Sequence, residues 1–276
     1  MFEWYTHLCE YYNVTPQQAL ELGSRSDGRK PNLPGSKTCQ SVSEKTYEDL
    51  WEMSDRKTTE QVFQFYRDMG AWNSFRQCVR HKDHEKLHMS VIGFLLKNGA
   101  LFDDAHICEY GCGIAPFITT FLKYLMPSET LNLNITLCEV DSEHFDFAKF
   151  RLNKIKESKN LNVNLNFETI LPNKLPDFSN IKLNSLICFE VLEHIPSPVA
   201  LINNIKNSMV PGGYYIENFI KHNDEEFEDG PDLLSAHNER DEYYEIVNEY
   251  FNLVVPTQME AEADPNCLKV WQRNSL

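Results

Sequence analysis

Short apolar runs alternate with helical patterns from about residue 101 onward. Each run has at most eight residues, which is the usual length of a buried strand. The runs are AHICEY, LNITLCEV, VNLNFETI, NSLICFE, GYYIENFI, FNLVVP and CLKVWQ. The helical patterns between them cover Pro116–Leu125, Ser142–Ser158, Pro198–Met209 and Ser235–Tyr250. Strands that alternate with helices of this length predict right-handed crossovers and an α/β fold with a mostly parallel sheet.

The last two apolar runs are joined differently from the others. Only about a dozen residues separate them, and these residues show no helical pattern. A hairpin is the connection that fits this length, since a parallel pair would need a longer crossover. We therefore expect one edge strand to run antiparallel to the rest.

The first 100 residues show helical patterns and no strand pattern. A loop rich in Gly, Pro, Ser and basic residues interrupts them, with the sequence GSRSDGRKPNLPGSKT. Thr15 and Pro16 resemble an N-cap followed by a first-turn proline. The expected helices are Trp4–Asn13, the segment that Pro16 opens, Glu44–Glu52, Thr58–Met69 and Lys82–Lys97. The chain thus divides into a helical extension over residues 1–100 and an α/β domain over residues 101–276.

Charge and cysteine usage narrow the classes of partner and compartment. The formal net charge is -15, so phosphate repulsion argues against binding to duplex nucleic acid or to an anionic membrane surface. There is no run of about 18 apolar residues and no basic, apolar leader, so neither a transmembrane helix nor a signal peptide is expected. The eight cysteines form no CxxC pair, which is typical of buried thiols in a reducing, cytoplasmic setting.

The first strand of the α/β domain runs into a glycine turn. In HICEYGCGIAPFITTFL, the strand ends near Glu109, Gly111 and Gly113 form a tight turn, and a helix begins near Pro116. Glycines at such a turn let the backbone approach a ligand, and the amides at the helix N-terminus can face it. A dinucleotide site would carry a Gly or Ala where Pro116 stands. The zwitterionic amino acid part of S-adenosylmethionine fits better, because Glu109 can meet its ammonium group.

The second strand ends in ITLCEVD, which places Glu139 at its carboxyl end. A carboxylate at this position can accept hydrogen bonds from both ribose hydroxyls of a nucleotide ligand. NAD and S-adenosylmethionine share this requirement, so Glu139 by itself does not separate them.

The fourth strand leads into Glu190, Glu193 and His194, an ExxEH cluster. Carboxyl ends of parallel strands line the ligand crevice, so the cluster should face the reacting atoms. Carboxylates with an imidazole can shape the substrate site, act as general base or hold a divalent ion. The sequence leaves these three roles open.

Three histidines lie close together before the α/β domain, in RHKDHEKLHMS. His84 and His88 are four residues apart and share a helix face, but no further metal ligand is identifiable. We expect His81, His84 and His88 to lie on a polar, partly exposed face of their helix.

Taken together, the motifs resemble those of class I S-adenosylmethionine-dependent methyltransferases. The stretches that carry the resemblance are EYGCGIAP, CEVDSEHFDFA, LICFEVLEHIPSP and LINNIKNSMVPGGYYIENF, in the order and spacing of the family. It implies a Rossmann-like, seven-stranded sheet with an antiparallel last strand. It implies that S-adenosylmethionine is bound by Glu109, Tyr110, Gly111, Cys112, Gly113, Glu139, Val140 and Glu190. In the family a histidine at this place often has a structural or orienting role, so His194, Glu190 and Glu193 are candidates for catalysis. Residues 1–100 are expected to form a lid over the acceptor.

The expected function is methyl transfer to an oxygen or nitrogen of a small-molecule acceptor. One alternative is an RNA 2′-O-methyltransferase with a metal held by Glu190, Glu193 and His194; the SRSDGRK loop favours it. The net charge and the acidic run HNDEEFEDGPD argue against it. The other alternative is a non-catalytic module that binds S-adenosylmethionine and regulates a partner, although the cofactor loop is intact. The sequence indicates no oligomeric state.

Overall fold

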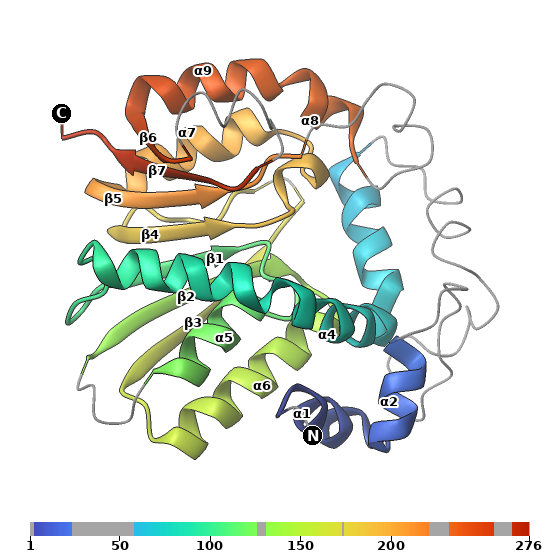
Figure 1. Cartoon of the computed structure of the whole chain (residues 1–276). Coiled ribbons are helices and arrows are strands. Elements are labelled where there is room, and N and C mark those ends of the chain that lie inside the picture. Colours follow the sequence, from blue (N-terminus) through green and yellow to red (C-terminus); the bar gives the residue numbers. More distant parts are fainter. Residues whose placement is uncertain are drawn as a thin grey trace. The chain divides into compact units, whose positions relative to one another are not determined.

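The computed structural model describes residues 3–23, 58–125, 131–172, 174–220, 232–256 and 267–275 (Figure 1). Contacts group the chain into two compact units. The first comprises Met1–Leu95, Cys112–Thr130 and Glu139–Asn162, and the second comprises Leu96–Gly111, Leu131–Cys138 and Val163–Leu276. The boundary expected near residue 100 stays a prediction. The helix expected over Glu44–Glu52, the basic loop after Gly23 and most of the acidic run lie outside the described residues.

A seven-stranded sheet runs through the second unit in the order β3-β2-β1-β4-β5-β7-β6. Its strands are close to the seven apolar runs of the sequence. The central strands β1, β2 and β4 are buried along most of their length, whereas the edge strands β3 and β6 are partly exposed. Their bounds are β1 His106–Tyr110, β2 Leu133–Val140, β3 Val163–Ile170, β4 Leu183–Cys188, β5 Met209–Glu217, β6 Phe251–Val255 and β7 Lys269–Arg273.

The strand directions confirm the predicted Rossmann-like sheet. Strand β1 pairs in parallel with β2 and β4, and β4 pairs in parallel with β5. Strand β7 runs antiparallel to both β5 and β6. The hairpin between the last two strands is therefore confirmed, but the expected position of the antiparallel strand at the edge is wrong. The hairpin folds β7 back against β5, which leaves β6 as the edge strand.

The helices of the second unit are short, and among those described α7 is capped by a side chain, that of Ser197. They are the single-turn helix η1 (Leu192–His194), α7 (Pro198–Ser208), α8 (Leu234–Asn238) and α9 (Arg240–Tyr250). The helix expected over Ser235–Tyr250 is thus two helices, which break at Glu239. The Glu239 carboxylate accepts hydrogen bonds from Ser197 Oγ at 2.9 Å and from the Val199 amide at 3.0 Å. A carboxylate at the N-terminus of α7 satisfies amides that have no partner within that helix.

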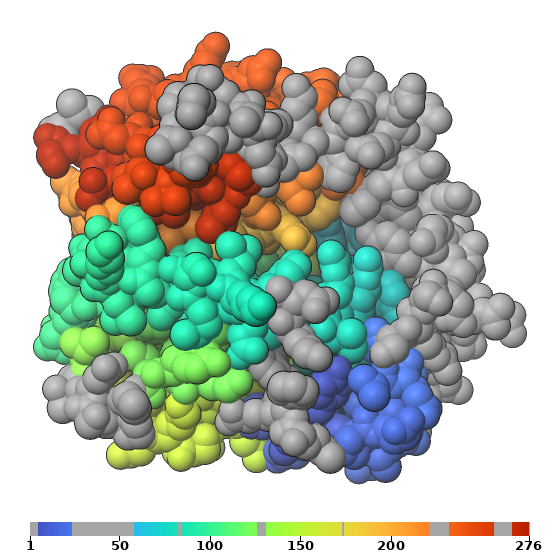
Figure 2. All heavy atoms as spheres, in the orientation of Figure 1, coloured from blue at the N-terminus to red at the C-terminus, as the bar shows by residue number. Residues whose placement is uncertain are grey.

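Helices α7 and α9 lie side by side in the second unit (Figure 1). In Figure 2, side chains of α9 form part of the surface of the second unit. On the inner side of α9, Tyr243 and Val247 are fully buried. The Tyr243 hydroxyl lies 2.6 Å from that of Tyr215 on β5. A hydrogen bond at this distance gives each of the two buried hydroxyls a partner.

The first unit is helical and contains α1 (Glu3–Tyr12), α2 (Pro16–Gly23), most of α4 (Thr59–Lys97), α5 (Pro116–Tyr124) and α6 (Glu143–Lys159). The predicted cap before Pro16 is confirmed, since the Gln18 amide donates to Thr15 Oγ1 at 3.3 Å. The separate helices expected over Thr58–Met69 and Lys82–Lys97 both lie within α4, which consists of two helices joined at a kink. Gly70 has a non-helical φ of 52° and ψ of -142°, so the expected end of the first helix at Met69 is confirmed, while the second helix begins before Lys82.

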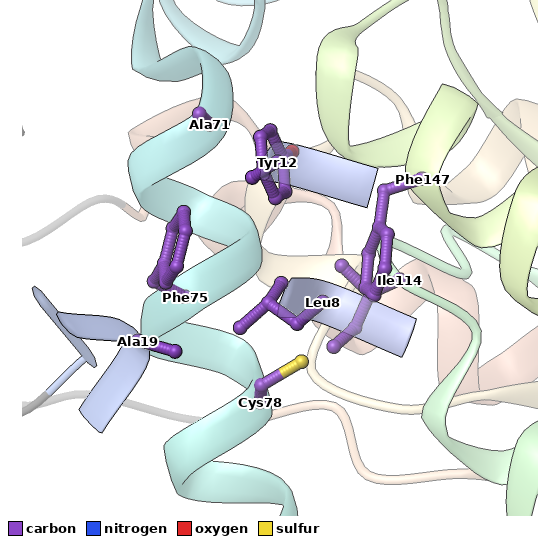
Figure 3. Close-up of a cluster of buried hydrophobic side chains, with 8 residues drawn as sticks. All are labelled: Leu8, Tyr12, Ala19, Ala71, Phe75, Cys78, Ile114 and Phe147. Atoms are coloured by element: carbon purple, nitrogen blue, oxygen red, sulfur yellow. The ribbon is translucent and has the colours of Figure 1, made fainter. Parts of the chain in front are cut away.

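The N-terminal helices share an apolar cluster with residues from much later in the chain (Figure 3). Its eight buried members are Leu8, Tyr12, Ala19, Ala71, Phe75, Cys78, Ile114 and Phe147. Burying a side chain such as Phe or Leu stabilises a fold by about 1.5–3 kcal/mol. This cluster therefore ties α1, α2 and α4 to the stretch around Ile114 and to α6. Within the described part of the chain, no helix is both long and apolar enough to cross a membrane.

Candidate functional site

The glycine turn after β1 has an unusual backbone. The φ angles of Gly111, Gly113 and Ala115 are 64°, 53° and 53°, all in the left-handed region. Glycine adopts this region freely, but for alanine it costs about 1–2 kcal/mol. Ala115 is the N-cap of α5, and Pro116 opens the helix. The loop thus follows a backbone path with three left-handed residues, and the surrounding structure must hold it in place.

The space that each glycine leaves open is taken by a side chain of the protein. In the first unit, a Cβ at Gly113 would lie 2.6 Å from Oε1 of Gln77 on α4. In the second unit, a Cβ at Gly111 would lie 2.5 Å from Cγ2 of Val191. Gly111 is required for packing against the stiff Val191 side chain as well as for φ, whereas Gly113 is required for φ and leaves room for the end of the Gln77 side chain. The close approach of a ligand, which the sequence predicts for these glycines, stays a prediction.

The loop amides that follow in the first unit all have acceptors. The Gly113 amide donates to Oε2 of Glu139 at 2.6 Å, and the Ile114 amide donates to Oε1 of Gln77 at 3.1 Å. The Ala115 amide donates to the Cys112 carbonyl at 2.6 Å. Hydrogen bonds in a buried setting fix geometry because leaving such a donor unpaired is costly. These three hydrogen bonds therefore hold the loop in one conformation.

Arg151 completes this arrangement from α6. Its side chain is fully buried, and its Nη2 donates to the carbonyl of Ile114. Its guanidinium also lies over the Phe147 ring, 5.2 Å from the centroid. Neither Gln77 nor Arg151 carries a sequence signal for this role, because both are ordinary polar residues of helices distant from the loop in sequence.

Glu139 is oriented by two amides of the first unit. Besides the Gly113 amide on Oε2, Oε1 accepts a hydrogen bond from the Val140 amide at 2.8 Å. His144 Nε2 lies 3.9 Å from Oε1 and 3.0 Å from Ser142 Oγ. A carboxylate has about four acceptor sites, so Glu139 can still accept from a vicinal diol. The ribose role predicted for it stays a prediction that this geometry favours.

The predicted cofactor residues on β1 are buried. Glu109 is only 4% exposed and Tyr110 only 2%. Strand β1 lies between β2 and β4, with Glu109 in register with Leu137 and Ile187. An ionised carboxylate in such surroundings needs compensation by a cation or by hydrogen bonds. Cys112 in the turn and Val140 after Glu139 are buried as well.

The residues after β4 form the second part of the predicted site, within the second unit. Glu190 has a φ of 51°, and its amide donates to Oδ1 of Asn218 at 2.7 Å. His194 Nδ1 lies 3.3 Å from Oδ1 of Asp232, and its Nε2 lies 3.9 Å from Oε1 of Glu193. Asp232 is thus a further acidic residue beside the ExxEH cluster, in contact with His194. The sequence placed Asp232 only in an acidic run, and its pairing with His194 depends on the fold.

Glu193 is the buried carboxyl of the ExxEH cluster. Burial raises its pKa well above its usual range, and the carboxylates of Asp232, Glu190 and Glu217 raise it further. Its Oε2 is buried and has no hydrogen-bond partner among the described residues. These conditions favour the protonated form of Glu193. A carboxyl with a shifted pKa at the end of a parallel strand is a frequent mark of a functional site.

Glu217 is a further carboxylate that sequence reasoning missed. It is the last residue of β5 and is fully buried. It accepts hydrogen bonds from the Phe219 amide at 2.6 Å and from Trp271 Nε1 at 2.9 Å. Burial raises its pKa, while the charges of Lys269 and Arg240 act in the opposite direction. Its position at the carboxyl end of a strand, in YYIENF, is the signal that could have found it.

The three histidines of α4 do not form an exposed face, so that expectation is wrong. His81 and His88 are each only 3% exposed, while His84 is half-buried. His81 Nε2 lies 3.0 Å from Thr120 Oγ1, and the His88 ring packs edge-on against Phe117. The reason is that α4 turns this face toward α5 in the first unit. Burial lowers the pKa of His81 to about 2 and that of His88 to about 4.

No group of three or more His, Cys, Asp or Glu side chains is arranged to hold a metal ion within the described ranges. The cysteines in those ranges are free thiols. Five of them, including Cys108, Cys112 and Cys138, are buried.

Comparison with known proteins identifies a known domain within part of this chain. Residues 108–215 match a family model described as a methyltransferase domain. No curated protein matches the chain. The fold resembles the magnesium protoporphyrin IX methyltransferase of Synechocystis PCC 6803, at 16% identity over 70% of this chain and 84% of that one, with a TM-score of 0.46. It also resembles the CurJ carbon methyltransferase, at 13% identity over 99% and 81%, with a TM-score of 0.48.

Structural likeness at this level says nothing about the acceptor. The matched methyltransferase domain begins within β1 and ends within β5, so it includes the glycine turn, Glu139 and the ExxEH residues. The chain is therefore an enzyme that transfers a methyl group, with S-adenosylmethionine as its cofactor.

Proposed function

We propose that this enzyme methylates an oxygen or nitrogen atom of a small-molecule acceptor. The observation that carries the proposal is the pairing of His194 with Asp232 at 3.3 Å, after β4 in the second unit. A carboxylate that accepts from Nδ1–H leaves the other ring nitrogen, Nε2, as the basic atom. Oxygen and nitrogen acceptors carry a proton that must leave, and this imidazole can take it.

The residues around the glycine turn fit the cofactor. Glu139 has acceptor sites left for the two ribose hydroxyls, and Glu109 is a buried carboxylate that suits a cationic ammonium group. We assign cofactor binding to Glu109, Tyr110, Gly111, Cys112, Gly113, Glu139, Val140 and Glu190. When bound, S-adenosylmethionine supplies a methyl group that its sulfonium charge activates for in-line displacement.

The chain's own contribution is positioning and proton transfer. Preformed hydrogen bonds in the loop reduce the cost of ordering when the cofactor binds. His194 accepts the acceptor's proton as the new bond to the methyl carbon forms, and Asp232 stabilises the imidazolium. Glu193, held in a buried setting that favours its protonated form, shapes the site without adding a further negative charge. Residues 1–100 cover the acceptor in this proposal.

The test is methyl transfer from radiolabelled S-adenosylmethionine into fractions of a metabolite extract. The wild-type enzyme should label a small molecule, and His194→Ala should lower the rate by about 10²–10⁴-fold while cofactor affinity is kept. Label found only in RNA would support the 2′-O-methyltransferase alternative. Cofactor binding without transfer to any fraction would favour the regulatory module.

A further inference from the structure

Helix α4 belongs to the N-terminal extension, yet its Gln77 lies directly on the cofactor loop. The Gln77 side chain accepts a hydrogen bond from the Ile114 amide at 3.1 Å and fills the space beside Gly113. We propose that Gln77 is a positioning residue for the cofactor loop, through which the N-terminal helices set the affinity for S-adenosylmethionine. The inference rests on the proposed binding of the cofactor at this loop.

The contact between Gln77 and the loop has little freedom. The place of a Gly113 Cβ lies 2.6 Å from Gln77 Oε1 and 3.0 Å from its Nε2, so the amide group of the side chain lies against the backbone itself. The approach is possible only because residue 113 is a glycine. The Gln77 side chain lies against Gly113 and also accepts the hydrogen bond of the Ile114 amide. Together these contacts fix the peptide between residues 113 and 114.

The side chain of Ile114 anchors the same peptide a second time. Ile114 is fully buried in the apolar cluster, together with Leu8, Phe75, Cys78 and Phe147 (Figure 3). Most of these partners come from α1 and α4, which precede the α/β domain in sequence. Together with the bond from Arg151 to the Ile114 carbonyl, the residue is held on its amide, its carbonyl and its side chain.

Because Ile114 is held in place, the predicted cofactor residues next to it are held as well. Gly113 is its neighbour in the chain, and the Gly113 amide donates to Glu139 at 2.6 Å. A loop that moved at Ile114 would move this amide and would release the carboxylate from its present orientation. Gln77 therefore acts on the cofactor through the loop, without needing to touch the methyl group.

Calorimetric titration of the full chain with S-adenosylmethionine and with S-adenosylhomocysteine tests this role. Gln77→Met keeps the length of the side chain but removes the acceptor, so both ligands should bind roughly three- to tenfold more weakly. Gln77→Glu keeps an acceptor oxygen and should bind both ligands within about twofold of the wild type. Gln64→Met, on an exposed position of the same helix, is the matched control and should leave both affinities unchanged.

Three outcomes overturn the inference. The first is wild-type affinity in Gln77→Met. The second is a loss confined to S-adenosylmethionine, because a residue that acts through the loop cannot distinguish the sulfonium from the thioether. The third is the same loss in Gln77→Glu as in Gln77→Met. Melting temperatures confirm that each variant is folded, and Gln77→Asn, which withdraws the acceptor by one methylene, replaces Gln77→Met if that variant does not fold. A wild-type chain that binds neither ligand would refute the proposed cofactor site itself, which is a different result.

Discussion

The glycine loop of the first unit and the segment after β4 in the second unit are built in opposite ways. In the loop, each amide from Gly113 to Ala115 has an acceptor within hydrogen-bond distance. After β4, carboxyl groups gather instead, and Oε2 of Glu193 has no hydrogen-bond partner among the described residues. The polar groups of the loop have hydrogen-bond partners, while the carboxyl groups after β4 repel one another when they are ionised.

This difference corresponds to two functions, ligand binding and catalysis. A binding loop gains affinity when its polar groups are already ordered, because less freedom is lost on binding. A reacting site needs groups whose protonation is sensitive to a change in charge, and such groups are made by burial and by like charges. We therefore expect substitutions in the loop to change cofactor affinity and stability, and substitutions after β4 to change pH dependence and rate.

The largest effect is expected at the glycine turn, for Gly111→Ala. The new Cβ would lie 2.5 Å from Val191 Cγ2, at a φ of 64° that alanine rarely adopts. We expect the free energy of unfolding to fall by about 2–4 kcal/mol, measured by urea denaturation. Gly212→Ala is the matched control, since Gly212 also has a positive φ but its Cβ would have open space, with the nearest atom at 4.0 Å. Equal losses in the two variants would show that packing against Val191 is not the reason.

The next effect is acid sensitivity in the first unit. The folded pKa of His88 is lowered to about 4 by burial and by the charge of His84, while the unfolded value is about 6.5. Below pH 6.5 the unfolded chain binds a proton that the folded chain does not, so stability falls as the pH drops toward 4. The contribution is about 3 kcal/mol. His88→Phe should reduce this fall in urea denaturation between pH 7 and 4, and His237→Gln should not.

A smaller effect is expected for Glu139→Gln, which tests the loop as a cofactor site. The variant keeps one acceptor oxygen but loses the charge that holds the Gly113 amide and would hold the ribose hydroxyls. Affinity for S-adenosylmethionine should fall by about 2 kcal/mol, or roughly 30-fold, in calorimetric titration. Glu157→Gln, on an exposed position of α6, should bind normally. Unchanged affinity in Glu139→Gln would reduce its role to bracing the loop.

The smallest effect concerns Glu193 and has the opposite pH sign from His88. Its folded pKa is raised by burial and by Asp232, Glu190 and Glu217, so the folded chain retains a proton that the unfolded chain has lost above about pH 4.5. Stability therefore falls as the pH rises toward the folded pKa. Glu193→Gln removes this term and should flatten the dependence by at most about 1.4 kcal/mol per pH unit just above pH 4.5, between pH 5 and 6. An unchanged slope in urea denaturation would contradict the assignment.

The sequence alone was sufficient for the succession of strands and helices in the α/β domain. Each apolar run and each helical pattern is a local signal with a period of its own, and the glycine turn depends on residues adjacent in the chain. Glu139 could be singled out for the same reason, because a strand's carboxyl end is readable from its own pattern. The matched methyltransferase domain starts within that first strand.

Other features could only be decided by the tertiary structure. The insertion of β7 beside β5 and the burial of His81 and His88 depend on what packs against them. Gln77 and Ile114 are 37 residues apart, as are Arg151 and Ile114, so no local pattern announces their contact. The sequence by itself thus determined where the glycine loop lies, and the folded chain decided what holds it, because hydrogen bonds and packing between distant segments exist only after folding.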